Sequence, residues 1–238
     1  MGEDREMKIV FEASDEFVAE NIPMPRPASL CLPDWYKEIP IQENGVKSFS
    51  STGRMNTTVK ACMPVLDAMT AGYIQETWCD VHVSIVDGQV EYVSSGKPSP
   101  VVARNARGTL ARREHRYHKF ELIWQNPYQI HTPKGTSCLI THPVNRVDLP
   151  FRVSEGIMDT DAGMFIPFGK VPFFLDNDFE GVIPAGTPMF QIIPFSRESW
   201  KSSMLLRTEE ERNKEHRKIT KYLVGAYRRI YRTPKEWK

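Results

Sequence analysis

Prolines are spread from Pro23 to Pro234, and they limit the fold more than any other feature of this sequence. The 238 residues contain 18 Pro against 14 Gly. Proline breaks the interior of a helix and cannot donate a hydrogen bond to a sheet ladder. So many prolines between short apolar runs predict short strands joined by ordered loops, and they argue against a helical bundle.

The clearest strand pattern lies on both sides of Asp87-Gly88. Polar and apolar residues alternate from Trp78 to Val86, and a second strand-like run, Gln89 to Val93, follows the pair. Alternation that flanks Asp-Gly is typical of a β-hairpin with a two-residue turn, so we expect a hairpin here. Further strands are expected at residues 7–12, 118–124, 136–141, 171–175 and 189–195.

A short helix is expected within residues 62–74. Val65 and Met69 are four residues apart, as on one face of a helix, and Pro64 suits the first helical turn. This helix would separate the N-terminal segment from the strands that follow it.

A longer helix is expected near the C-terminus. Thr208 and Glu211 have the spacing of a capping box, and the acids at the start and bases at the end suit the helix dipole. One apolar stripe consists of Ile219, Leu223, Tyr227 and Ile230. The helix would end at Thr233-Pro234. We expect this amphipathic helix either to pack on the sheet or to mediate assembly.

The composition argues against several classes of function. Lys plus Arg is 31 and Asp plus Glu is 30, so general nucleic-acid binding, which depends on neutralising phosphates, is not expected. No apolar run approaches the roughly 20 residues that span a bilayer, and no signal-peptide pattern is present. The four cysteines, Cys31, Cys62, Cys79 and Cys138, are expected to be buried free thiols. We therefore expect a soluble cytoplasmic protein, or part of a particle that is assembled inside a cell, with no membrane partner.

The motifs of common enzyme chemistry are missing from the sequence. None of the six histidines lies in an HxD or HxE pattern, and a metal site needs several converging ligands. The P-loop, GxGxxG, GxSxG and HExxH motifs do not occur. We therefore expect no metal, no cofactor and no catalytic residues.

One block of sequence nevertheless resembles part of a known architecture. The block is Gly156-Ile157-Met158-Asp159-Thr160-Asp161; Thr132-Pro133-Lys134-Gly135 precedes it and Gly186-Thr187-Pro188-Met189-Phe190-Gln191-Ile192-Ile193 follows it. Over residues 130–195 this order resembles the dUTPase and dCTP-deaminase superfamily. The resemblance implies a β-clip fold, commonly trimeric. It also implies that Asp159 acts as a general base near a metal-bound phosphate, with Gln191 close to the phosphates.

The same region departs from that superfamily at its catalytic motifs. Ala162 stands where the superfamily has a tyrosine that stacks on deoxyribose, and His142-Pro143-Val144-Asn145-Arg146 replaces its Arg-Ser-Gly phosphate block. The glycine-rich C-terminal phosphate arm is absent, since Gly225 is the last glycine after Gly186. We therefore lean against an enzyme, and magnesium is expected only if the chain works as a dUTPase.

The whole chain also resembles a family of proteins from tailed phages and some bacteria. The residues that carry this resemblance are Pro33-Asp34-Trp35-Tyr36-Lys37, Leu66-Asp67-Ala68-Met69-Thr70-Ala71-Gly72-Tyr73, Trp124-Gln125-Asn126-Pro127 and Thr141-His142-Pro143-Val144-Asn145-Arg146. This resemblance implies a phage-related origin and supplies no activity.

Taken together, the patterns predict a mainly β protein of the α+β type. Residues 1–60 are expected to be an extended, Pro-rich segment that packs on the core, residues 61–197 a β-rich core domain, and residues 198–238 a C-terminal helical segment. The core is expected to be β-clip-like or another compact barrel of short strands. The exposed edges of such strands favour a homo-oligomer, with a trimer as one option.

Seven polar residues are candidates for binding a small phosphorylated ligand: Asp67, His142, Asn145, Arg146, Asp159, Asp161 and Gln191. Asn145-Arg146 in a Pro-bounded loop has the chemistry to clamp a carboxylate or phosphate, or else to stabilise its own loop. Our first hypothesis is a non-catalytic, phage-related module that binds a nucleotide-like ligand. The alternatives are a structural component of a phage particle, in contact with other phage proteins, and a divergent dUTP pyrophosphatase.

Overall fold

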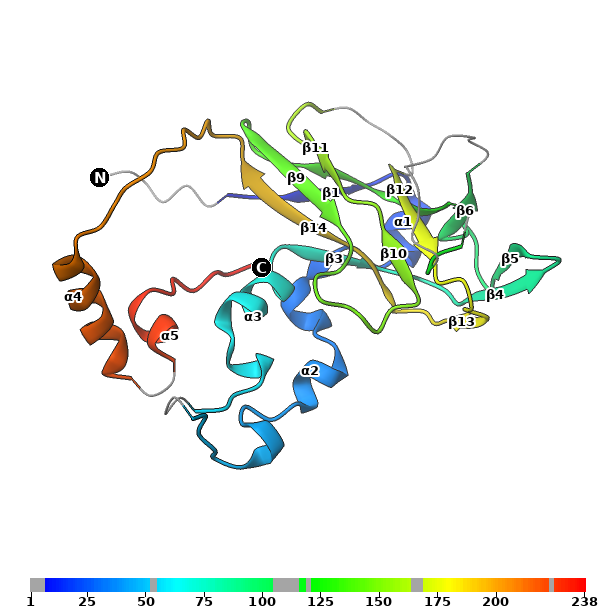
Figure 1. The fold of residues 1–238 in the computed structure, drawn as a ribbon. Coiled ribbons are helices and arrows are strands. Elements are labelled where there is room, and N and C mark those ends of the chain that lie inside the picture. The colour runs from blue at the N-terminus through cyan, green and yellow to red at the C-terminus, as the bar shows by residue number, and fades with distance from the viewer. Residues whose placement is uncertain (1–6, 52–54, 105–115, 119–120, 164–168, 223–224) are drawn as a thin grey trace.

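The computed structural model describes residues 7–51, 55–104, 116–118, 121–163, 169–222 and 225–238. Strands predominate in these residues, and they form four antiparallel sheets (Figure 1). The expected mainly β class is therefore confirmed. The strands are short, as expected, but the expected compact barrel is wrong for the described strands, because they pair into four separate sheets that do not close.

The largest sheet contains Gln191 and the short strand that leads into Asp159 and Asp161. Its five strands, in spatial order, are β11 (Gly156–Met158), β9 (Thr136–Thr141), β14 (Pro188–Ser196), β3 (Tyr73–Glu76) and β2 (Arg26–Pro27). β14 is the longest strand described, and it pairs with β9 on one side and β3 on the other. Its side chains Phe190 and Ile192 are completely buried, so the middle of β14 belongs to the core while its end reaches the surface.

Three smaller sheets complete the β structure. The four-stranded sheet has the order β10 (Phe151–Val153), β12 (Gly169–Leu175), β7 (Leu122–Asn126) and β6 (Val101–Ala103). The three-stranded sheet has the order β13 (Gly181–Ile183), β4 (Val81–Val86) and β5 (Gln89–Ser94). β1 (Val10–Ala13) pairs with β8 (Tyr128–His131).

The expected hairpin is confirmed as β4 and β5. Asp87 has a φ of 52° and Gly88 a φ of 72°, and positive φ at both central residues is the requirement of the hairpin turn that matches strand twist. The main core lies among the sheets. At its centre the Trp124 and Phe173 rings stack at 4.1 Å between centroids, and Phe151 meets both edge-on.

Short helices interrupt the N-terminal segment. They are α1 (Glu16–Asn21), the 3₁₀ turn η1 (Ala28–Cys31), α2 (Asp34–Glu38), and the 3₁₀ turns η2 (Glu43–Gly45) and η3 (Val59–Ala61). β1 and β2 attach this segment to two sheets, and the Tyr128 hydroxyl donates to the carbonyl oxygen of Ile22 at 2.5 Å. The helix expected within residues 62–74 is α3 (Met63–Met69), with a proline in its first turn.

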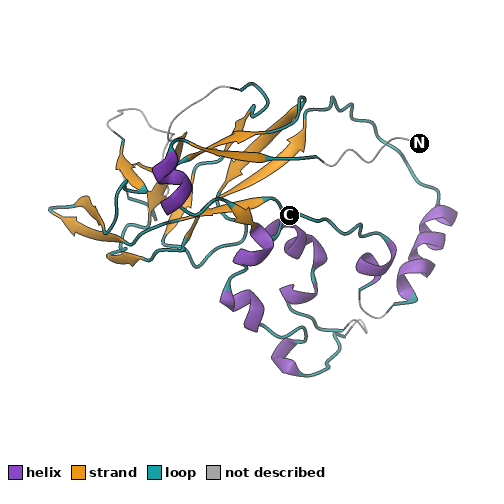
Figure 2. Cartoon of the chain, turned by 180° about the vertical axis from the view of Figure 1, so that it is seen from behind, coloured by secondary structure: helices purple, strands orange, loops and turns teal. Residues whose placement is uncertain are grey.

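The C-terminal helical segment differs from the expected single helix. It contains α4 (Glu209–Thr220) and α5 (Ala226–Ile230), with Gly225 at a φ of 78° before α5 (Figure 2). A left-handed residue ends a helical run, so Ile219 and Tyr227 do not share one stripe; Leu223 lies outside the described residues. The capping box of Thr208 and Glu211 is confirmed. α4 buries none of its residues.

The cysteines are free but not uniformly buried. Cys79 and Cys138 are buried, Cys31 is half-buried and Cys62 is exposed, so the expectation of four buried thiols is wrong for two of them. Among the described helices, none is both long and apolar enough to cross a membrane.

A glycine holds α3 and β3 close to β14, and replacing it will be costly. Gly72 has a φ of +64°, and a Cβ there would lie 2.0 Å from the carbonyl oxygen of Ile192. Gly88 has a similar φ of +72°, but a Cβ added to it would meet nothing within 4 Å. We expect Gly88→Ala to cost about 1–2 kcal/mol through backbone strain alone. Gly72→Ala should cost more than about 3 kcal/mol, because β14 must also move. Urea unfolding of both variants measures this, and equal costs would contradict it.

Candidate functional site

The acidic block after β11 is bound to an arginine that follows β14. Arg197 approaches Asp159 at 3.0 Å and donates from Nη1 to Asp161 Oδ1 at 2.9 Å, while its Nη2 also donates to Asp161. Ser137, on the intervening strand β9, donates to Asp159 Oδ1 at 2.6 Å. We call Arg197, Asp159 and Asp161 the sheet clamp.

The sheet clamp also holds the turn before β9. The Gly135 N–H donates to Asp161 at 2.8 Å, and the Arg197 N–H donates to the Gly135 carbonyl at 2.8 Å. The pKa of Asp161 is lowered by Arg197 and then by the Gly135 N–H, and that of Asp159 by Ser137 and then by Arg197. Both carboxylates are therefore ionised near neutral pH, but the lowered pKa and the bonds to Arg197, Ser137 and Gly135 make them weak general bases.

The candidate loop at residues 142–146 stabilises itself. His142 is buried; burial lowers the pKa of this imidazole, and its Nε2 lies 3.0 Å from the Arg146 carbonyl. The Arg146 N–H donates to the Pro143 carbonyl at 3.1 Å, and Asn145 between them has a φ of 61°. Asparagine tolerates this left-handed turn conformation better than most residues. His142 Nδ1 is buried and has no hydrogen-bond partner within the described residues.

Gln191 links parts of the fold to one another and is not an exposed ligand-binding residue. Its side chain is completely buried on β14. It donates to the carbonyls of Ala68 and Ala71 at 3.1 and 2.6 Å, and accepts from the Val144 N–H at 2.8 Å. These bonds join β14 to the end of α3 and to the candidate loop, and they use both amide hydrogens and one lone pair of the amide oxygen.

Arg146 faces a polar cleft, but its guanidinium is already paired. It donates to both oxygens of Asp148, from Nη2 at 2.7 Å and from Nε at 2.9 and 3.1 Å. The cleft has a volume of about 430 Å³, and its other two cations are also paired with acids of its lining: Arg26 with Glu76 and Lys37 with Asp34. The carboxylate that the predicted clamp holds is thus the chain's own Asp148, and the charges in this cleft balance.

Asp67 binds the C-terminal tail. Arg232 donates to it from Nη2 at 2.7 Å and from Nε at 3.1 and 3.2 Å, and Lys235 donates from Nζ at 3.1 Å. The hydrogen bonds from Arg232 lower the pKa of Asp67 most. We call this group the helix clamp, because Asp67 lies on α3.

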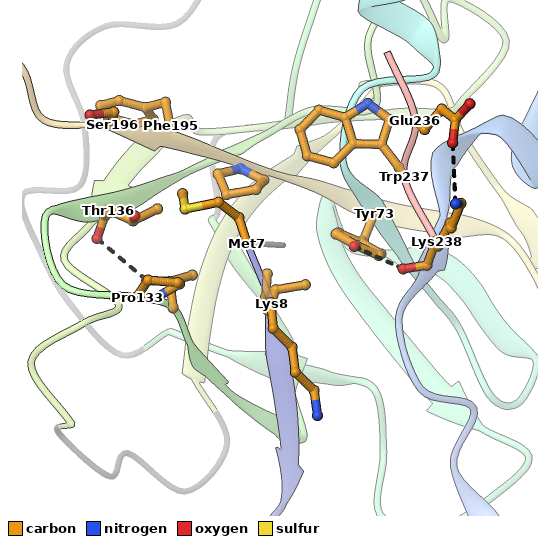
Figure 3. Close-up of a pocket in the computed structure, with 13 residues that line it drawn as sticks. Met7, Lys8, Tyr73, Pro133, Thr136, Phe195, Ser196, Glu236, Trp237 and Lys238 are labelled. Atoms are coloured by element: carbon orange, nitrogen blue, oxygen red, sulfur yellow. Dashed lines mark hydrogen bonds and ion pairs between the residues drawn. The ribbon is translucent and has the colours of Figure 1, made fainter. Parts of the chain in front are cut away.

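A cavity lies elsewhere, between residues 7–9 and residues 236–238. We call it the aromatic cleft; its volume is about 800 Å³. Figure 3 shows Met7, Tyr73, Phe195 and Trp237 around it. The Tyr73 ring meets Trp237 edge-on at 6.2 Å between centroids, and the Tyr73 hydroxyl donates to the Lys238 carbonyl oxygen at 3.0 Å. The helix clamp, a few residues before Trp237, therefore helps to keep one wall of the cleft in place.

The structure does not gather the seven candidates into one site. His142, Asn145, Arg146 and Gln191 lie around one loop, Asp159 and Asp161 lie in the sheet clamp, and Asp67 lies in the helix clamp. Arg197, Arg232 and Trp237 were missed because their partners are distant in sequence. Among the described residues, no group of three or more His, Cys, Asp or Glu side chains is placed to hold a metal ion. Comparisons with protein families, curated proteins and solved structures find no match for this chain.

The lowered pKa of Asp161 makes the sheet clamp sensitive to acid. A carboxyl whose pKa is lower in the folded state stabilises the fold above its unfolded pKa of about 3.9 and loses this contribution as pH falls through the folded pKa. We expect Asp161→Asn to lower the urea midpoint at pH 7, with a smaller difference from the native protein at pH 2. Asp159→Asn, at the more exposed carboxylate, should have a smaller effect. An equal difference at both pH values would argue against the clamp.

Removing the helix clamp should release the tail. In Asp67→Asn the paired charges of Arg232 and Lys235 lose their counterion, so we expect faster hydrogen exchange in residues 232–238 and around Tyr73. Asp34→Asn is the matched control, since it removes an exposed ion pair with Lys37 three residues away. Exchange in the tail that is unchanged by Asp67→Asn would show that Trp237 alone anchors it.

Proposed function

We propose that this chain is a homo-oligomeric assembly protein, a structural component of a phage-related particle, without catalytic activity. One observation carries the proposal. Every residue of the segment 197–207, which we call the arm, is exposed, and the large apolar side chains along it are each 85% to 96% exposed: Trp200, Met204, Leu205 and Leu206. An arm that presents so many large apolar side chains to water fits a neighbouring subunit.

The energetics support burial of the arm in an assembly. Burying one large apolar side chain contributes roughly 1.5–3 kcal/mol, and contiguous exposed apolar surface commonly marks a protein interaction site. Every residue from Phe195 to Lys214 is exposed, so the fold of the single chain gains nothing from the apolar character of Trp200 and Leu205. Burial of these side chains against a partner would gain that free energy.

The candidate acids support the same proposal in another way. The sheet clamp lies at one root of the excursion formed by the arm, α4 and α5, and the helix clamp lies at the other. Figure 1 shows this excursion leaving the end of β14 and returning toward α3. Asp161 and Asp67 would therefore anchor an assembly element to the core at both ends.

The other two hypotheses remain predictions. Binding of a nucleotide-like ligand at Arg146 would compete with its ion pair to Asp148. In the same way, dUTP pyrophosphatase chemistry at Asp159 would compete with its ion pair to Arg197. The resemblance of the chain to phage proteins supports the particle proposal. We include a β-clip-like core at residues 130–195 in the proposal, and this resemblance favours a trimer.

The proposal predicts self-association through the arm. The native protein should form a defined oligomer in sedimentation velocity, and Trp200→Ser with Leu205→Ser should shift it toward monomer. The control is Val147→Ser, at a side chain that is 80% exposed but lies on a loop outside the arm. A native protein that stays monomeric at every concentration tested would contradict the proposal.

A further inference from the structure

We infer that the aromatic cleft is the acceptor for the arm of a second copy of this chain. The inference rests on the proposed assembly function and names the surface that the arm meets. It starts from a juxtaposition: an exposed segment with large apolar side chains and a cleft with aromatic residues in its wall lie next to each other, and no described residue of the arm fills the cleft.

The cleft and the arm are continuous along the backbone. Phe195 and Ser196, the last residues of β14, line the cleft, and Trp200 follows only four residues later. The chain then leads away from the cleft toward α4 (Figure 1), and Trp200 stays 88% exposed. The arm thus does not fill the cleft from which it leaves, so a neighbouring copy is the available source of an identical arm.

The lining of the cleft suits apolar side chains better than a charged ligand. Several of its polar groups are already bonded within the chain: the Tyr73 hydroxyl to Lys238, Glu236 to Lys238 at 3.2 Å, and the Thr132 hydroxyl to that of Thr160 at 2.7 Å. Small-molecule sites normally place a few free polar groups to orient their ligand. The larger share of its exposed lining is apolar, and it includes the side chains of Met7, Phe195 and Trp237 (Figure 3).

The sizes are compatible with a stable contact. A cleft of about 800 Å³ has room for several large side chains. Trp200 alone offers about 150–250 Å² for burial, and a standard interface takes about 800 Å² from each partner. Four large apolar side chains on the arm supply a substantial share of that area. Because donor and acceptor are different surfaces, the contact forms a reciprocal pair, a closed ring or an open filament, depending on the rotation between neighbouring copies.

Mixing two complementary variants tests this arrangement. The arm variant, Trp200→Ser with Leu205→Ser, keeps a native cleft. The cleft variant, Phe195→Lys, keeps the native apolar residues of the arm and places a charge in the cleft. Met7→Lys is a second cleft variant on a different segment, so it leaves the root of the arm unchanged. Each variant alone should self-associate at least about 30-fold more weakly than the native protein, as expected for a hot spot, with Val147→Ser as the control.

An equimolar mixture of the arm variant with either cleft variant should form a one-to-one heterodimer, because one intact arm then meets one intact cleft. Folding of each variant is checked by circular dichroism. If the arm variant is monomeric while Phe195→Lys and Met7→Lys both assemble like the native protein, the assembly proposal stands and the cleft is not the acceptor. A mixture that remains monomeric also overturns the inference.

A small-ligand site gives a different result. A nucleotide panel, with and without magnesium, is screened by thermal shift against the arm variant, whose cleft is open. Stabilisation by one nucleotide that is lost when Phe195→Glu, which repels phosphate, is added would assign the cleft to a ligand and overturn the inference. No stabilisation, together with a restored heterodimer, is the result that the inference predicts.

Discussion

Pairing between arginine and carboxylate holds the C-terminal part of this chain to its core. At the sheet clamp one guanidinium, Arg197, faces two carboxylates, and at the helix clamp one carboxylate, Asp67, faces two cations. The planar fork of arginine matches a carboxylate with two parallel hydrogen bonds, so each clamp sets an orientation as well as an attachment. The arm, α4 and α5 bury almost nothing between these two points, and their placement depends on them.

The features that sequence reasoning predicted well are local. The hairpin at Asp87-Gly88 needs two residues with positive φ, and the capping box at Thr208 needs an acid three residues on; both signals lie within a few positions. The barrel and the single C-terminal helix were wrong for the opposite reason. Whether short strands close into a barrel depends on distant pairings, and the helix pattern carried no signal strong enough to show that Gly225 would adopt a left-handed conformation.

The candidate residues were chosen for chemistry that the fold uses as structure. Asp161 was conspicuous in sequence, but its partner lies 36 residues away, and the partner of Asp67 lies 165 residues away. A single arginine just after a strand has no sequence signature, so Arg197 could be found only once β9, β11 and β14 were seen side by side. Gln191 is, in sequence, only a polar residue within an apolar run. Its structural role follows from its three backbone partners, which the sequence does not show.

The path of β14 has a mechanical consequence. The arm continues directly from this strand, which is hydrogen-bonded on both sides, to β9 and to β3. A pull on the arm by a neighbouring subunit would act along the strand axis, so the ladder to β9 at Gln191–Ser196, and behind it the ladder to β3 at Pro188–Ile192, would bear the force in shear. Strands loaded this way resist extraction far better than strands that are peeled apart one bond at a time. The geometry would let a thin, exposed segment transmit tension into the centre of the protein.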